Sequence, residues 1–203
     1  MSVPSFEEIS ELVRARQKES RFTHTLAVVR EAEYIARACA FSEEETAKVR
    51  LAALLHDITK NFSDEEQAAM IEKYGIEAPG EPPTVHEKTG AYFARELLGA
   101  DVVDEEIFSA IYRHTTGGAG MSKLDMAIFI ADFTEETRTH SSCADMRAYL
   151  HAECERLSAE RGKEEALLCD VTLRIIENTM NFLALKRRKI DLRMIEAWNY
   201  LVL

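Results

Sequence analysis

The chain has 203 residues, of which 46% are hydrophobic and 30% are charged, as is usual for one globular domain. Its 25 Lys and Arg residues against 36 Asp and Glu residues give a formal net charge of −11. This acidic balance disfavours non-specific binding to nucleic acid or to an anionic membrane. It is compatible with an anionic small-molecule substrate, because local cations or metal ions can outweigh the overall charge.

The four cysteines form no CxxC pair, which favours reduced thiols in a protein core. No apolar run reaches the length of a membrane span. The first ten residues contain neither the basic nor the apolar part of a signal peptide. These observations predict a cytoplasmic protein.

Helix starts are marked by capping boxes, in which a Ser or Thr is followed three residues later by an acidic residue. Five such pairs begin at Ser5, Ser42, Ser63, Thr84 and Ser122. With only 8 Gly and 4 Pro, long stretches are free of helix breakers, which predicts an all-α fold. The predicted helices cover residues 5–18, 21–40, 43–58, 63–74, 84–98, 104–113, 122–139, 142–160, 164–186 and 191–201.

The dipeptide His56-Asp57 ends the apolar run 51–55, so a polar pair is expected at the end of a buried helix. A buried carboxylate is costly without a partner, and a metal ion is one such partner. Taken alone, a pair of this kind is more often a hydrogen-bonded pair within a core. The dipeptide therefore indicates a metal site only if other ligands accompany it.

Two further segments supply such ligands. Asp132 follows the apolar run 127–131, and His24 lies in the first turn of a helix with an apolar inner face. Three helices would then present two imidazoles and two carboxylates, from His24, His56, Asp57 and Asp132. This donor set suits a first-row divalent metal ion better than it suits Ca²⁺.

The order His24…His56-Asp57…Asp132 resembles the H…HD…D signature of the HD-domain superfamily, whose members are helical metal-dependent phosphohydrolases. The chain is most similar to the YqeK-type branch, described as symmetrical bis(5′-nucleosyl)-tetraphosphatases. The segments that carry the resemblance are 21–24, 54–60, 85–90, 114–117, 121–122 and 131–138.

The resemblance spans about residues 20–140, and the C-terminal part resembles such proteins only in length and helical character. We expect an HD-type helical bundle that forms a single domain over residues 1–203, with its motif-bearing core at about residues 20–140. Residues from about 141 to 203 would form a C-terminal helical extension.

Two more histidines, His86 and His114, are ambiguous from their positions alone, since they fit a helix-start histidine and a loop histidine. Similarity to the dinuclear HD branches implies that both bind a second metal ion, with Asp57 bridging the two ions. The first ion would be held by His24, His56, Asp57 and Asp132, and the second by His86, His114 and Asp57. Imidazole-rich ligation suits iron, manganese, cobalt or zinc better than magnesium, and the family implies iron.

Lys60 and the pair Thr115-Thr116 are candidate phosphate contacts. Lys60 follows Asp57 by three residues, and the resemblance implies that it contacts a substrate phosphate; it also fits a surface lysine at a helix end. Thr115 and Thr116 lie in a glycine-containing loop whose hydroxyls and amides can hold a phosphate oxygen. The alternative is an ordinary flexible loop.

Arg138 and Arg21 are weaker candidates of the same kind. Arg138 lies six residues after Asp132, and could reach a substrate phosphate or form a helical salt bridge with Glu135. Arg21 lies three residues before His24. Neither position decides between the two interpretations.

The resemblance implies an enzyme that cleaves diadenosine tetraphosphate and related dinucleoside polyphosphates symmetrically to two ADP. A metal-bridging hydroxide would attack a central phosphorus, with Asp57 and Lys60 as catalytic residues. The expected partner is this nucleotide, and a homodimer is also compatible with the chain. The alternatives are a mononuclear HD nucleotidase acting on another nucleotide, a dinuclear iron oxygenase of the superfamily, and a non-catalytic nucleotide sensor.

Overall fold

The computed structural model describes residues 4–78, 80–157 and 162–202. Within these ranges the protein is all-α, as predicted, with ten helices and no strand. The helices are α1 (Phe6–Arg14), α2 (Glu19–Ala38), α3 (Glu43–Leu55), α4 (Asp64–Tyr74), α5 (Val85–Leu98), α6 (Glu105–Arg113), α7 (Lys123–Thr134), α8 (Ser141–Leu157), α9 (Glu164–Leu185) and α10 (Leu192–Leu201). None of the helices in the described ranges combines the length and hydropathy that a bilayer crossing requires.

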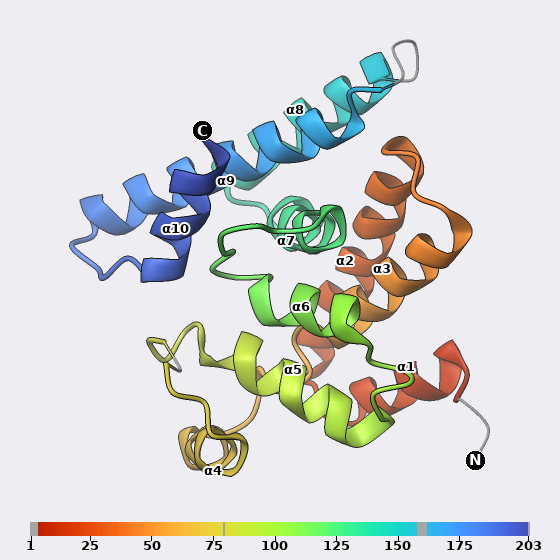
Figure 1. Cartoon of the computed structure of the whole chain (residues 1–203), viewed down its shortest axis with the longest axis vertical. Helices are drawn as coiled ribbons and strands as arrows, with labels where there is room; N and C mark the ends of the chain where they lie inside the picture. Colours follow the sequence, from red (N-terminus) through yellow and green to blue (C-terminus); the bar gives the residue numbers. More distant parts are fainter. Residues whose placement is uncertain (1–3, 79, 158–161, 203) are drawn as a thin grey trace.

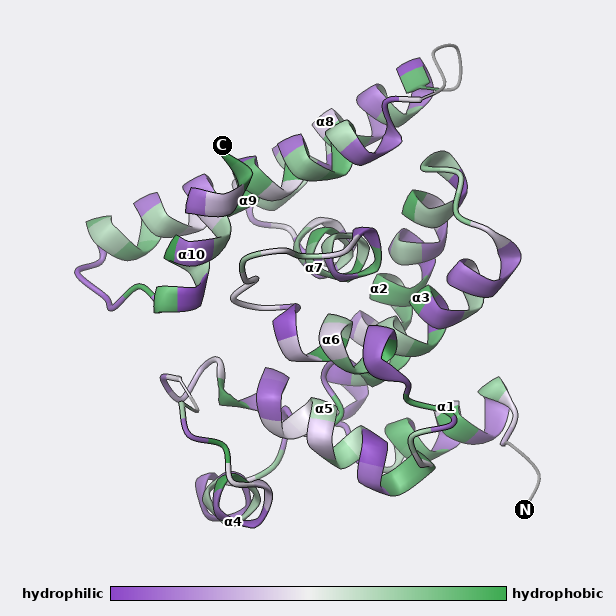
Figure 2. Ribbon diagram, viewed as in Figure 1, coloured by the Kyte–Doolittle hydropathy of each residue, from purple (hydrophilic) through white to green (hydrophobic). Residues whose placement is uncertain are grey.

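Helix α7 lies at the centre of the molecule (Figure 1). It packs against α2 and α3, against α6, and against α8 and α9. Every residue from Leu124 to Ala131 is buried, because a helix with neighbours on all sides has no solvent-facing stripe. Hydrophilic residues gather instead on the outer turns of helices such as α4 and α8 (Figure 2). The end of α7 therefore lies deep in the bundle, and Asp132 lies with it.

Helices α8 and α9 form a long antiparallel pair along one side of the bundle, and α10 packs against α9 (Figure 1). The described part of the C-terminal region is thus helical. It packs directly against α7 and α2, which belong to the motif-bearing core. Helix α9 contributes residues to the walls of two cavities, and α10 contributes to one of them.

The predicted first, third and seventh helices end three or more residues earlier than expected, at Arg14, Leu55 and Thr134. After Leu55 the chain continues in tighter turns, in which the amide of Lys60 donates to the carbonyl of Asp57 at 3.0 Å. After Thr134, Glu135 is extended (ψ 154°). No glycine or proline marks these ends, which is why helical periodicity alone extended the helices too far.

The predicted capping boxes at Ser5, Ser42, Ser63 and Ser122 are all present. The one predicted at Thr84 is wrong, since its side chain makes no capping bond and its hydroxyl donates to the carbonyl of Glu81 at 3.0 Å. Glu87, the acidic residue of this predicted box, is fully buried. It has other partners, which lie beside the candidate site.

Candidate functional site

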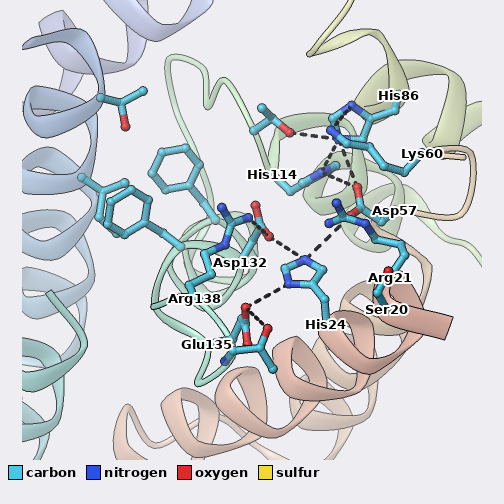
Figure 3. Close-up of a pocket in the computed structure, with 16 residues that line it drawn as sticks. Ser20, Arg21, His24, Asp57, Lys60, His86, His114, Asp132, Glu135 and Arg138 are labelled. Atoms are coloured by element: carbon cyan, nitrogen blue, oxygen red, sulfur yellow. Dashed lines mark hydrogen bonds and ion pairs between the residues drawn. The ribbon is translucent and has the colours of Figure 1, made fainter. Parts of the chain in front are cut away.

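A cavity of about 580 Å³ opens beside the carboxyl ends of α3, α6 and α7. Helix α2 contributes one wall, and α5 and α9 contribute others (Figure 3). Every site residue predicted from the sequence lines this cavity except His56 and Thr116. His56 is fully buried directly behind it, next to Asp57.

The first cluster around the cavity joins three helices. His24 Nε2 lies 3.0 Å from Asp132 Oδ1 and 3.7 Å from Asp57 Oδ2. His56 Nε2 lies 3.4 Å from the same Asp57 oxygen and 3.8 Å from Asp132 Oδ1. Two imidazoles and two carboxylates therefore converge on one small volume, as the pattern of polar residues after apolar runs predicted.

The second cluster lies on the other side of Asp57. Its Oδ1 atom is 3.1 Å from His86 Nε2 and 3.7 Å from His114 Nε2, and the two imidazole nitrogens are 3.1 Å apart. The two oxygens of one carboxylate thus face two different pairs of histidines. Figure 3 shows His24 on one side of Asp57 and His86 with His114 on the other. Each cluster contains three residues whose ligand atoms are close enough to share one ion.

Hydrogen bonds to the outer ring nitrogens orient three of these imidazoles. His56 Nδ1 lies 2.7 Å from the carbonyl of Ala53, and His114 Nδ1 lies 2.7 Å from that of Ile111. A carbonyl only accepts, so both Nδ1 atoms carry a proton and both Nε2 atoms point inward. His24 is held in the same way, because its Nδ1 is 3.0 Å from the buried carboxylate of Glu135.

The inward nitrogens fit a metal ion. The Nε2 atoms of His24 and His56 are buried without a hydrogen-bond partner, although His24 Nε2 is close to Asp132. His24 Nε2 and Asp132 Oδ1 are close to each other, but they are not aligned for a hydrogen bond. Buried polar atoms without partners are rare in folded proteins, and here they point at carboxylate oxygens. An ion between them would satisfy both nitrogens at once.

The protonation states are consistent with ligation. Burial opposes ionisation of Asp57 and Asp132, but the histidines around Asp57, and Arg138 with His24 beside Asp132, hold both pKa values well below the usual one. Burial lowers the pKa of His56, and it lowers the pKa of His86 to about 4. Burial also opposes protonation of His24 and His114, yet their carboxylate neighbours raise the pKa of His24 to about 9 and also raise that of His114. The carboxylates are therefore ionised, and metal ions must displace a proton at His24 and at His114.

Three basic side chains surround the clusters. Arg21 Nη1 lies 2.9 Å from Asp57 Oδ2, and Arg138 Nη2 lies 2.6 Å from Asp132 Oδ1. The salt bridge considered between Arg138 and Glu135 is not the one formed, because α7 ends before both residues. Lys60 Nζ lies 3.1 Å from His86 Nδ1, so it is not an ordinary surface lysine.

The two predicted threonines have different surroundings. Thr115 lines the cavity, with its hydroxyl 3.3 Å from His86 Nε2. Thr116 is fully buried behind the wall, and its hydroxyl donates to Glu87 at 2.7 Å.

Sequence reasoning missed Glu87 and Glu135, because both acids already had a local explanation as helix residues. Phe129 belongs to the hydrophobic core and Phe133 packs against it, and both also line the cavity.

The fold and the site together define a helical, metal-dependent hydrolase. The family model of the HD domain matches residues 21–137, more than half of the chain, and the chain belongs to this family. Its two His and Asp clusters have the donor atoms to hold a divalent metal ion.

Named relatives extend the comparison over the whole chain. A symmetrical bis(5′-nucleosyl)-tetraphosphatase from Bacillus subtilis is 29% identical over 199 residues, covering 97% of each chain. Its counterpart from Halalkalibacterium halodurans is 29% identical over 202 residues, covering 95% of each. Among solved structures, a protein from Clostridium acetobutylicum described as a predicted HD superfamily hydrolase involved in NAD metabolism has a TM-score of 0.79 at 27% identity, covering 99% of this chain and 98% of that one.

Proposed function

We propose that this protein cleaves dinucleoside tetraphosphates symmetrically, converting diadenosine tetraphosphate and water to two ADP with two divalent metal ions. The observation that carries the proposal is the pair of oxygens of Asp57, which face separate histidine pairs. A carboxylate shared in this way suits two neighbouring ions. The named activity of relatives that match nearly the whole chain supports the substrate.

The proposed first ion is held by His24, His56, Asp57 and Asp132, and the second by His86, His114 and Asp57. Bound ions of this kind activate water and offset the charge that develops on a reacting phosphate. The chain's own contribution is to fix the ligands and to keep Asp57 ionised as the bridge.

Arg21, Lys60 and Arg138 explain how so acidic a chain attracts a polyphosphate. All three line the cavity, and both guanidinium groups lie beside ligand carboxylates, within reach of phosphate oxygens on the same ions. In the reaction a central P–O–P bond breaks and water supplies the new oxygen. Lys60 is proposed to neutralise the charge on the departing ADP, and Thr115 to contact a phosphate oxygen.

We infer iron as the metal, because four imidazoles and two carboxylates favour first-row transition ions over magnesium. The decisive experiment incubates the protein anaerobically with ferrous iron and diadenosine tetraphosphate and resolves the products. ADP alone is expected. ATP plus AMP would refute symmetrical cleavage, and no turnover with metal bound would indicate the nucleotide sensor. Turnover without dioxygen would exclude the oxygenase.

We further infer a cytoplasmic location, because all four cysteines are free and three of them are buried. Cell fractionation tests it, with the protein expected among reduced cytosolic proteins. A homodimer stays a prediction from the sequence.

A further inference from the structure

A second cavity, of about 350 Å³, adjoins the metal cavity. Thr115 and Thr179 line both, so the two cavities share a wall. Thr115 is also the residue whose hydroxyl lies next to His86, in the second histidine cluster. The second cavity therefore begins where that cluster ends.

The walls of the second cavity suit a nucleoside. Leu183, Met194 and Pro83 provide apolar surface, and hydroxyl, carboxylate and basic groups stand around it, including Asp191 and Arg188. Small-molecule sites have this composition, a mostly apolar pocket of about 300–1,000 Å³ with a few polar groups that fix orientation. A purine offers the matching surface, with two apolar faces and a polar edge.

The cavity is held together by contacts between the core and the C-terminal helices. Lys189 Nζ lies 2.7 Å from Glu81 Oε1, which joins the end of α9 to the loop before α5. Gly80 lets that loop approach α10, since a Cβ there would lie 3.3 Å from Asp191 Oδ2 and 2.6 Å from Thr84 Oγ1. The C-terminal extension thus completes a site beside the metal cluster.

We propose that the second cavity binds the second nucleoside of a dinucleoside polyphosphate. This inference rests on the proposed function, because symmetrical cleavage leaves identical nucleoside diphosphates on the two sides of the broken bond. The metal cavity would hold one half. The other half would extend past Thr115, with Arg188 among the polar groups around its nucleoside; Arg188 has no ion-pair partner among the described residues.

The test fills the cavity and compares two substrates. Leu183 is half-buried, so L183W should place an indole in the cavity without disturbing the core. The matched control is L185W on the same helix, where the native side chain is 84% exposed. We expect L183W to lower kcat/KM for diadenosine tetraphosphate at least about tenfold, mainly through KM. Its kcat/KM for adenosine 5′-tetraphosphate, which has one nucleoside, should stay within about twofold.

If L183W lowers kcat/KM for both substrates, or for neither, the proposal is overturned. A second pair of variants guards against misfolding of L183W: R188E should raise KM for diadenosine tetraphosphate selectively, and K186E, with the same charge change at another exposed position, should not.

Equilibrium titration with ADP separates this inference from the proposed function. The metal-loaded wild-type protein should bind two ADP per chain and L183W one. If the wild type cleaves neither substrate but binds two ADP, the proposed function fails and the second site stands. If it cleaves diadenosine tetraphosphate but binds one ADP, the second site is refuted.

Discussion

Glu87 and Arg193 form a partly buried ion pair that joins α5 to α10, with 3.0 Å between Oε1 and Nη1. The Glu87 carboxylate is fully buried and also accepts from the backbone amides of Thr115 and Thr116. Arg193 in turn donates to the carbonyl of Gly117 at 2.9 Å. The loop after His114 is therefore held from both sides, by the core and by the C-terminal extension.

Removal of one partner should leave the other charge buried and unpaired. We expect R193M to lower the free energy of unfolding by about 3 kcal/mol, measured by denaturant titration. The loss in free energy of unfolding for the double variant E87Q/R193M should be smaller than the sum of the losses for the two single variants, because neither charge is then left alone. Strict additivity in this cycle would show that the pair contributes nothing specific to the loop.

The parts of the site that the residue pattern alone predicted had a local signal, whereas His86 and His114 were predicted only through the family resemblance. His56-Asp57 and Asp132 each interrupt an apolar run, and a polar group at such a position needs a partner. Glu87 and Arg193 had no such signal, since they meet across 106 positions. Local patterns report the buried face of a helix, whereas contacts of this length depend on how the helices pack.

The second histidine cluster gives a prediction about metal stoichiometry. The protein purified with excess ferrous iron should contain two ions per chain by elemental analysis. H86A and H114A should each contain one, because each removes a proposed ligand of the second ion only. Activity should fall by at least about two orders of magnitude if two ions act together. Full activity in either variant would favour the mononuclear nucleotidase.

The bond from His24 Nδ1 to Glu135 predicts an effect on metal affinity. E135Q keeps the size of the side chain but removes the charge that makes the imidazole a better ligand. Competition with a chelator should show about 10–100-fold weaker metal binding, the range found when such supporting groups are changed. E136Q is the matched control, because its carboxylate is exposed and pairs with Arg30 at the surface. Equal metal affinity in the two variants would show that Glu135 is not needed to position His24.

Lys60 allows substrate binding to be separated from metal binding. Its Nζ lines the cavity and also contacts His86, so it could act on the phosphate or through the ligand. We expect K60M to lower kcat/KM by about 10–100-fold with the metal content unchanged, because a charge-assisted phosphate contact is lost. K60R should restore part of the activity, and K73M, at an exposed lysine that pairs with Glu96, should have none of these effects. A parallel fall in metal content and activity in K60M would instead assign Lys60 to the positioning of His86.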